Sequence, residues 1–100
     1  MIVYIFEYEI NSGMEQAYWD FMKAEGAPFW LQFPEVKRYE VYSKIGGHGS
    51  FEGRVELENF ADFEKIWSHP DLSYISQKTA GFTHNTQRRF LVLDKVFDLK

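Results

Sequence analysis

The first ten residues alternate with a period of two. The odd positions become charged at Glu7 and Glu9, whereas every even position is apolar or aromatic. The even set comprises Ile2, Tyr4, Phe6, Tyr8 and Ile10. Because β-branched and aromatic residues fit a pleated strand better than a helix, the pattern predicts a strand over residues 2–10. One face of this strand is expected to be fully buried, and the other only near its start.

After residues 11–13 the apolar spacing changes to three and four, which is typical of an amphipathic helix. Ser12, followed three residues later by Glu15, has the form of a capping box at the start of this helix. The repeating positions are Met14, Ala17, Tyr18, Phe21 and Met22. A helix is therefore predicted from about residue 14.

Two prolines limit this first helix. Pro28 has no N–H and its ring would clash with the carbonyl of Ala24, so a kink or restart is expected near residues 26–28. Pro34 disfavours the helical conformation at Phe33. The helix is predicted to end at or just before Phe33.

The middle of the chain predicts a hairpin. Residues 36–45 alternate as a second strand, and residues 51–57 alternate as a third. The glycine-rich residues 46–49 predict the turn between them, where His48 is expected to face solvent. These glycines are not expected to hold a phosphate, because a strand rather than a helix follows them.

A second helix is predicted after Asn59, which is a favourable N-cap. Its apolar positions fall at helical spacing and are Phe60, Phe63, Ile66 and Trp67. His69 and Pro70 are expected to stop it.

The last thirty residues predict one more helix and one more strand. Asp71 can cap a helix over residues 72–80, which Gly81 is expected to end in a left-handed conformation. Residues 83–87 are polar and predict a loop, and residues 88–99 predict the last strand.

The predicted order is β-α-β-β-α-β, the ferredoxin-like α+β fold, in which a four-stranded antiparallel sheet carries its helices on one face. One hundred residues fit a single domain, residues 1–100. The first and last strands are apolar on both faces, as Val3, Ile5 and Leu91 illustrate. An uncovered apolar face of that size exceeds what a monomer tolerates. The chain is therefore expected to form a homodimer, with two sheets face to face in a dimeric α+β barrel.

Composition narrows the function. Aromatic residues make up 19% of the chain, which excludes extensive disorder. A net charge of −4 argues against a nucleic-acid partner. No apolar run is long enough for a membrane span, and no signal peptide is visible. We therefore expect a cytoplasmic location and no membrane partner. The absence of cysteine excludes disulfides and thiolate metal sites.

The whole chain resembles the dimeric α+β barrel superfamily, which includes antibiotic-biosynthesis monooxygenase-like, NIPSNAP-like and stress-responsive barrel proteins. The resemblance rests on the aromatic first strand, the break at residues 27–29, the stretch 33–36 and the apolar spacing from Phe60 to Pro70. It implies a homodimer and, in each subunit, a cleft for a small apolar or aromatic ligand between the first helix and the sheet.

The residues expected at that cleft are Tyr4, Phe6, Tyr8, Tyr18, Phe21, Met22, Trp67 and His69. The tyrosine hydroxyls would supply the few polar groups that orient a ligand in an apolar pocket. His69 is the candidate catalytic residue, because an imidazole can act as a base near neutral pH. The simpler interpretation makes Phe6 and Trp67 core residues and His69 a helix stop that contacts the last carbonyls.

Two further sets of polar residues are expected to be structural. Three histidines without short spacing, His48, His69 and His84, predict no metal site, and no cofactor is expected. Charged residues on the central strands predict a polar interface between the two sheets rather than a catalytic pair. They are Glu7, Glu9, Arg38, Glu40, Glu52, Arg54 and Glu56.

Three functions remain open. The first is a homodimeric binding protein for a mainly apolar ligand, an acyl chain or an aromatic molecule. The alternative is a cofactor-independent monooxygenase or isomerase of the antibiotic-biosynthesis monooxygenase type, with His69, Trp67 and Tyr8 at its site. The third is a ligand-free interaction dimer, which deep burial of the tyrosines would favour.

Overall fold

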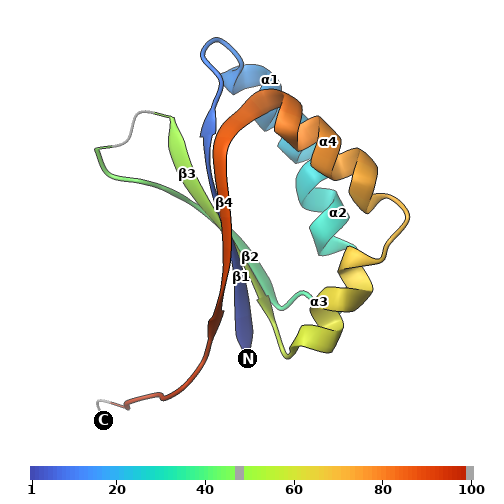
Figure 1. Ribbon diagram of the computed structural model, residues 1–100, viewed down its shortest axis with the longest axis vertical. Coiled ribbons are helices and arrows are strands. Elements are labelled where there is room, and N and C mark those ends of the chain that lie inside the picture. Colours follow the sequence, from blue (N-terminus) through green and yellow to red (C-terminus); the bar gives the residue numbers. More distant parts are fainter. Residues whose placement is uncertain (47–48, 99–100) are drawn as a thin grey trace.

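The computed structural model describes residues 1–46 and 49–98, which form one antiparallel sheet with helices packed against one of its faces (Figure 1). The elements are β1 (Ile2–Ile10), α1 (Glu15–Phe21), the π-helical segment η1 (Met22–Gly26), α2 (Ala27–Leu31), β2 (Arg38–Ser43), β3 (Ser50–Leu57), α3 (Phe60–Trp67), α4 (Leu72–Phe82) and β4 (Thr83–Val92). The predicted ferredoxin-like order is confirmed; the first predicted helix is divided into α1, η1 and α2, whereas the two helices predicted after Asn59 appear as α3 and α4.

The strand order is β2-β3-β1-β4, so β1 and β3 form the centre of the sheet. Tyr4 of β1 lies opposite Val55 of β3 on one side and Phe90 of β4 on the other. The ring of Phe6 packs over Gly53, where an added Cβ would lie only 2.3 Å from the Phe6 ring. Glycine at this position therefore lets an aromatic ring lie flat across the neighbouring strand.

The first helical region is interrupted where the prolines predicted a break. In η1 the Ala27 N–H donates to the Met22 carbonyl five residues earlier, which is the π-helical pattern. Pro28 follows at the start of α2, where its missing N–H is tolerated. The expected kink is confirmed, and it begins about one turn before Pro28. α2 ends at Leu31, before Phe33 as expected.

One predicted cap is confirmed and three are wrong. Asn59 caps α3, since its Oδ1 accepts from the Asp62 N–H at 3.0 Å. α1 begins at Glu15 after Met14 with no side-chain cap, so Ser12 and Glu15 form no capping box. Asp71 likewise caps nothing through its side chain. Gly81 remains within α4, which ends only at Phe82.

The predicted loop over residues 83–87 is wrong, because β4 begins at Thr83 directly after α4. Pairing with β1 accounts for this, since Thr83 lies opposite Ile10 and the Asn11 N–H donates to the Phe82 carbonyl at 2.8 Å. β4 also ends earlier than predicted, at Val92 rather than residue 99. β2 is shorter than the predicted 36–45. His48, predicted to face solvent, lies outside the described residues.

Within residues 1–46 and 49–98, no helix covers the other side of the sheet, which we call the open face (Figure 1). Charged side chains pair with one another across its centre. Arg89 binds Glu7 and also lies 3.4 Å from Glu52, and Lys44 binds Glu7 at 3.2 Å. Arg54 donates to Glu52 at 2.6 Å. The hydrogen bonds from Arg89 and Lys44 lower the pKa of Glu7 to about 2.

The same side of the molecule carries exposed apolar side chains toward the end of the chain. Leu91 and Leu93 are 49% and 47% exposed, and beyond β4 Val96 and Phe97 are 76% and 81% exposed. The segment that carries Val96 and Phe97 runs away from the body of the molecule (Figure 1). The open face is thus a charged centre with an apolar extension.

Candidate functional site

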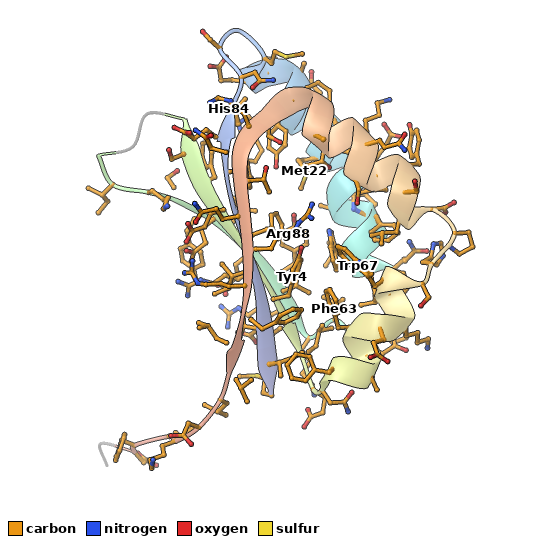
Figure 2. All side chains as sticks on the ribbon, in the orientation of Figure 1. Tyr4, Met22, Phe63, Trp67, His84 and Arg88 are labelled. Atoms are coloured by element: carbon orange, nitrogen blue, oxygen red, sulfur yellow. The ribbon has the colours of Figure 1, made fainter. Side chains whose placement is uncertain are left out.

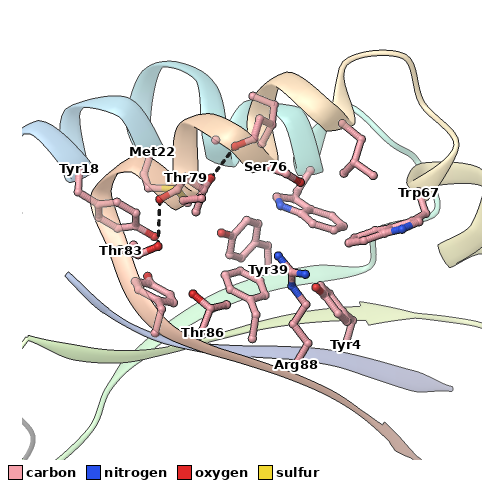
Figure 3. Close-up of a pocket in the computed structure, with 17 residues that line it drawn as sticks. Tyr4, Tyr18, Met22, Tyr39, Trp67, Ser76, Thr79, Thr83, Thr86 and Arg88 are labelled. Atoms are coloured by element: carbon pink, nitrogen blue, oxygen red, sulfur yellow. Dashed lines mark hydrogen bonds between the residues drawn. The ribbon is translucent and has the colours of Figure 1, made fainter. Parts of the chain in front are cut away.

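A cavity of about 80 Å³ lies between the sheet and the helices (Figure 3). Most of the elements contribute to its wall: β1, β2 and β4 from the sheet, and α1, η1, α2, α3 and α4 from the helical layer. The lining residues are Tyr4, Phe6, Tyr8, Tyr18, Met22, Gly26, Trp30, Tyr39, Trp67, Leu72, Ile75, Ser76, Thr79, Ala80, Thr83, Thr86 and Arg88. We call this space the aromatic cavity.

At one end of the aromatic cavity three tyrosine hydroxyls are buried without partners. The Tyr8, Tyr18 and Tyr39 hydroxyl oxygens have no hydrogen-bond partner within the described residues. The side chains of Tyr8 and Tyr18 are only 3% and 0% exposed. Buried polar groups in native proteins are nearly always hydrogen-bonded, so three buried hydroxyl groups without partners at one cavity need an explanation.

Burial dominates the titration of these phenols. Desolvation raises the pKa of Tyr8 to about 12 and raises the pKa values of Tyr18 and Tyr39 further. Proximity acts as well: the phenol groups of Tyr8 and Tyr39 raise the pKa of Tyr18 further, and the approach of the Tyr18 hydroxyl partly lowers the pKa of Tyr8. All three therefore stay protonated at neutral pH and can donate a hydrogen bond.

The opposite end of the aromatic cavity is more exposed and contains a charged side chain, Arg88. Figure 3 shows Arg88 beside Tyr4 and on the same side of the cavity as Trp67. The Arg88 guanidinium carbon lies 5.9 Å from the Trp67 ring centroid, within cation–π range. Trp67 is 39% exposed. Within the described part of the chain, Arg88 is the one charged residue that lines the cavity, and no ion pair neutralises it there.

A bulge in β4 sets the direction of its side chains. Glu7 lies opposite Gln87, but Glu9 lies opposite His84, so one extra residue is accommodated in β4. Asn85, at this irregularity, has a positive φ of 53°. As a result Thr83 and Thr86, three residues apart, both line the cavity together with Arg88.

Six of the eight residues expected at the cleft line the aromatic cavity. They are Tyr4, Phe6, Tyr8, Tyr18, Met22 and Trp67. Figure 2 shows Tyr4, Met22 and Trp67 in the space between sheet and helices.

The structure does not bring Phe21 and His69 to this cavity. Phe21 is buried against Phe82, with ring centroids 5.5 Å apart. His69 packs edge-on against Phe29 and Phe33, at 5.6 and 5.3 Å, and its Nδ1 accepts from the Asp71 N–H at 3.1 Å. This is the arrangement of a residue that ends a helix, so His69 is in no position to act on a molecule in the cavity.

The wall of the aromatic cavity that α4 and β4 form was not predicted from the sequence. α4 supplies Ser76 and Thr79, and β4 supplies Arg88, although the cleft was expected between the first helix and the sheet. Tyr39 of β2 also lines the cavity, and it was not among the residues expected at the cleft. Arg88 could have been found within the predicted strand over residues 88–99, because alternation puts it on the same face as Phe90, and it lies opposite Phe6 of β1.

Two searches within the described residues gave negative results. No group of three histidine, cysteine, aspartate or glutamate side chains is arranged to hold a metal ion there. No helix in that part of the chain has both the length and the apolar character needed to cross a bilayer.

No protein-family model and no curated protein matches the chain, whereas many solved structures share its fold. SnoaB of Streptomyces nogalater, described as a cofactor-independent oxygenase, is 9% identical with a TM-score of 0.79 over 95% of this chain and 94% of its own. A NIPSNAP domain protein from Burkholderia xenovorans is 16% identical with a TM-score of 0.72, over 98% and 99%. A dimeric ferredoxin-like protein of unknown function from Thermobifida fusca YX is 18% identical with a TM-score of 0.74, over 92% and 90%.

These likenesses define a class by fold. The chain has the ferredoxin-like fold of the antibiotic-biosynthesis monooxygenase and NIPSNAP structures, so the expected resemblance is confirmed at the level of fold. At sequence identities this low, the similarity establishes the fold but not an activity, because proteins with one fold have many different functions.

Proposed function

We propose that this protein is a homodimer in which each subunit binds a small, mainly apolar molecule, such as an aromatic compound or an acyl chain, in the aromatic cavity. The observation that carries the proposal is the group of buried hydroxyls of Tyr8, Tyr18 and Tyr39 at one cavity. An unsatisfied buried hydroxyl costs about 1–3 kcal/mol. A core that served packing alone would be more stable with phenylalanine at these positions, whereas a binding site needs the polar groups.

The size of the cavity requires movement on binding. Ligand pockets usually enclose roughly 300–1,000 Å³, against about 80 Å³ here. α4 is the wall we expect to move, because Ile75 is its one buried residue and a helix with so little burial separates from the sheet at low cost. A ligand that gains contacts only in the open arrangement would stabilise it.

The open face supports the dimer. Its apolar residues Leu91 and Leu93 are about half exposed, and the exposed Phe97 extends the apolar area beyond β4. The charges of Glu7, Glu52, Arg54 and Arg89 are paired within one subunit, so a second sheet can cover these four side chains without separating an ion pair. The partner we propose is a second copy of this chain.

Methyl resonances of purified protein test the binding directly. Toluene, a small aromatic probe, is expected to shift the signals of Met22 and Ile75 saturably, because both side chains line the cavity. Ile45, which is fully exposed, is the control and should not move. Absence of any shift at Met22 and Ile75 with toluene, and likewise with its oxygenated analogue phenol, up to the solubility limit of each, would overturn the binding function.

A ligand-free dimer is the main rival. Tyr4, Tyr8 and Tyr18 are all deeply buried, which was the expected mark of such a protein. Their burial does not explain why two of the three hydroxyls lack partners beside a cavity. The toluene titration separates the two functions.

An enzymatic function of the cofactor-independent oxygenase type is the second candidate, favoured by Arg88 and Trp67 at the exposed end of the cavity. Arg88 could stabilise an anion that forms on a substrate. His69 lies elsewhere and the lining tyrosines stay protonated, so no lining residue would serve as a base at neutral pH. Oxygen consumption with a dihydroxy-aromatic substrate, lost in Arg88→Gln and retained in His69→Ala, would support this candidate; no consumption by the unaltered protein would exclude it for that substrate.

A further inference from the structure

Three side chains from three different elements meet at the closed end of the aromatic cavity. Tyr8 comes from β1, Tyr18 from α1 and Tyr39 from β2. The Tyr8 and Tyr18 rings lie 5.4 Å apart. Figure 3 shows the hydroxyls of Tyr18 and Tyr39 directed into the space between them.

We propose that the hydroxyls of Tyr8, Tyr18 and Tyr39 act together to recognise one neutral oxygen atom of the ligand, a hydroxyl or a carbonyl, at the closed end of the cavity. This inference rests on the proposed binding function. It adds the chemical type of the ligand group that lies at the closed end of the cavity. A ligand oxygen accepts two hydrogen bonds from the phenol O–H groups, and a ligand hydroxyl can in turn donate one to the oxygen of the third phenol.

The charges around the cavity favour a neutral group over an ionised one. The one charged lining residue described, Arg88, lies at the exposed end beside Trp67. Thr79 and Thr83 approach the closed end, but their hydroxyls already donate to the Ile75 and Thr79 carbonyls, at 2.8 and 3.0 Å. An ionised group at the closed end would therefore be desolvated without a counter-ion, which is costly.

Buried water is the competing explanation. A cavity of about 80 Å³ has room for roughly two or three waters at ~30 Å³ each, and these could satisfy the three hydroxyls. Water and a ligand oxygen differ in a measurable way. Only specific recognition makes the cavity prefer an oxygenated molecule over a hydrocarbon of the same shape.

Phenol and toluene form a suitable pair of probes, because a hydroxyl replaces a methyl group on the same ring. In a cavity that provides no hydrogen bonds, toluene would bind more tightly, since phenol must lose its hydration. The proposal predicts the opposite order, with phenol bound at least about tenfold more tightly than toluene. The affinities are measured from the Met22 and Ile75 methyl shifts of the full chain at neutral pH.

Tyr18→Phe is the decisive variant. It should weaken phenol binding about tenfold and leave toluene binding unchanged, because only the hydroxyl is lost. Tyr42→Phe on the open face is the matched control and should change neither affinity. Tyr39→Phe repeats the measurement from another element should Tyr18→Phe fold poorly.

The outcomes separate the two proposals. If toluene binds as tightly as phenol or more tightly, or if Tyr18→Phe and Tyr39→Phe leave the preference for phenol intact, hydroxyl recognition is wrong while ligand binding stands. If neither probe binds the unaltered protein, the binding function itself is wrong.

Discussion

On the helix-covered face of the sheet, the hydroxyls of Tyr8, Tyr18 and Tyr39 are buried without partners. On the open face, by contrast, Arg89 and Arg54 hold the carboxylates of Glu7 and Glu52. The two faces of the sheet thus differ in whether their polar groups have partners. At the centre of the open face the charges are paired within the subunit, as on a surface that docks against another protein. The covered face leaves donors unused, as a site that awaits a ligand does.

The largest expected effect is a difference in the free energy of unfolding between substitutions on the two faces. Tyr4 is 3% exposed, and its ring contacts five other aromatic rings on the covered side. Tyr4→Ala should lower the free energy of unfolding by about 3–5 kcal/mol, because it removes a large buried side chain. Tyr42→Ala, at a 42% exposed position of the open face, should cost about 1 kcal/mol. Urea unfolding monitored by tryptophan fluorescence gives both values, and equal losses would contradict the assigned core.

A charge within the apolar part of the open face should separate the subunits. Burying the exposed half of Leu91 is worth about 1–2 kcal/mol per copy, counted twice across a two-fold interface. Leu91→Glu should therefore raise the dimer dissociation constant on the order of 10²-fold with little change in subunit stability. Sedimentation velocity at micromolar concentration provides the measurement. Leu31→Glu, at an exposed position on α2, is the control and should leave the dimer intact; an unaltered protein that sediments as a monomer would contradict the dimer.

The charged centre of the open face makes a pH-dependent prediction. Arg89 and Lys44 lower the pKa of Glu7 from 4.5 to about 2. A carboxyl whose pKa is lower in the folded state stabilises the protein fully above its unfolded pKa, and loses this effect as the pH falls toward its folded pKa. Glu7→Gln should thus be less stable than the unaltered protein near pH 6, with a difference that shrinks between about pH 4.5 and 2. Urea unfolding across this range measures the difference, and a constant gap would show that the Arg89 pair does not act through ionisation.

The smallest expected effect concerns the covered face, where it is the most informative. Tyr18→Phe removes a buried hydroxyl that has no partner, so stability should stay unchanged or rise by up to about 1 kcal/mol. Thr83→Val removes a buried hydroxyl that donates to the Thr79 carbonyl, and this should cost about 1 kcal/mol. A loss of more than about 1 kcal/mol in Tyr18→Phe would mean that its hydroxyl is already satisfied, and the argument for a ligand would fail.

The covered face was predictable from the sequence where period and side-chain type agree. The even positions of β1 and the interruption before Pro28 gave the central strand and the broken helix. The wall made by α4 and β4 was missed, because residues 83–87 are polar and read as a loop. Strand pairing with β1 overrides that local preference, and the bulge near Asn85 that turns Thr83 and Thr86 inward has no clear sequence signal.

The placement of His69 shows a different limit. Sequence spacing put His69 near Trp67 at the end of the same helix, yet α3 ends at Trp67 and His69 lies in the segment that follows it. Trp67 faces the cavity, whereas His69 packs between Phe29 and Phe33. The hydroxyl cluster was predicted only in part: Tyr8 and Tyr18 were expected at the cleft, but Tyr39 was not, since the convergence of the three depends on elements far apart in the sequence.

Titration of the methyl-labelled protein with phenol tests the contrast between the two faces in one spectrum. Met22 and Ile75 line the aromatic cavity, whereas Ile5 is fully buried from the other side of β1. Saturable shifts of Met22 and Ile75, with Ile5 unmoved, are the result we predict. Shifts that never saturate, or that affect Ile5 as much as Met22, would show that the buried hydroxyls do not mark a ligand site.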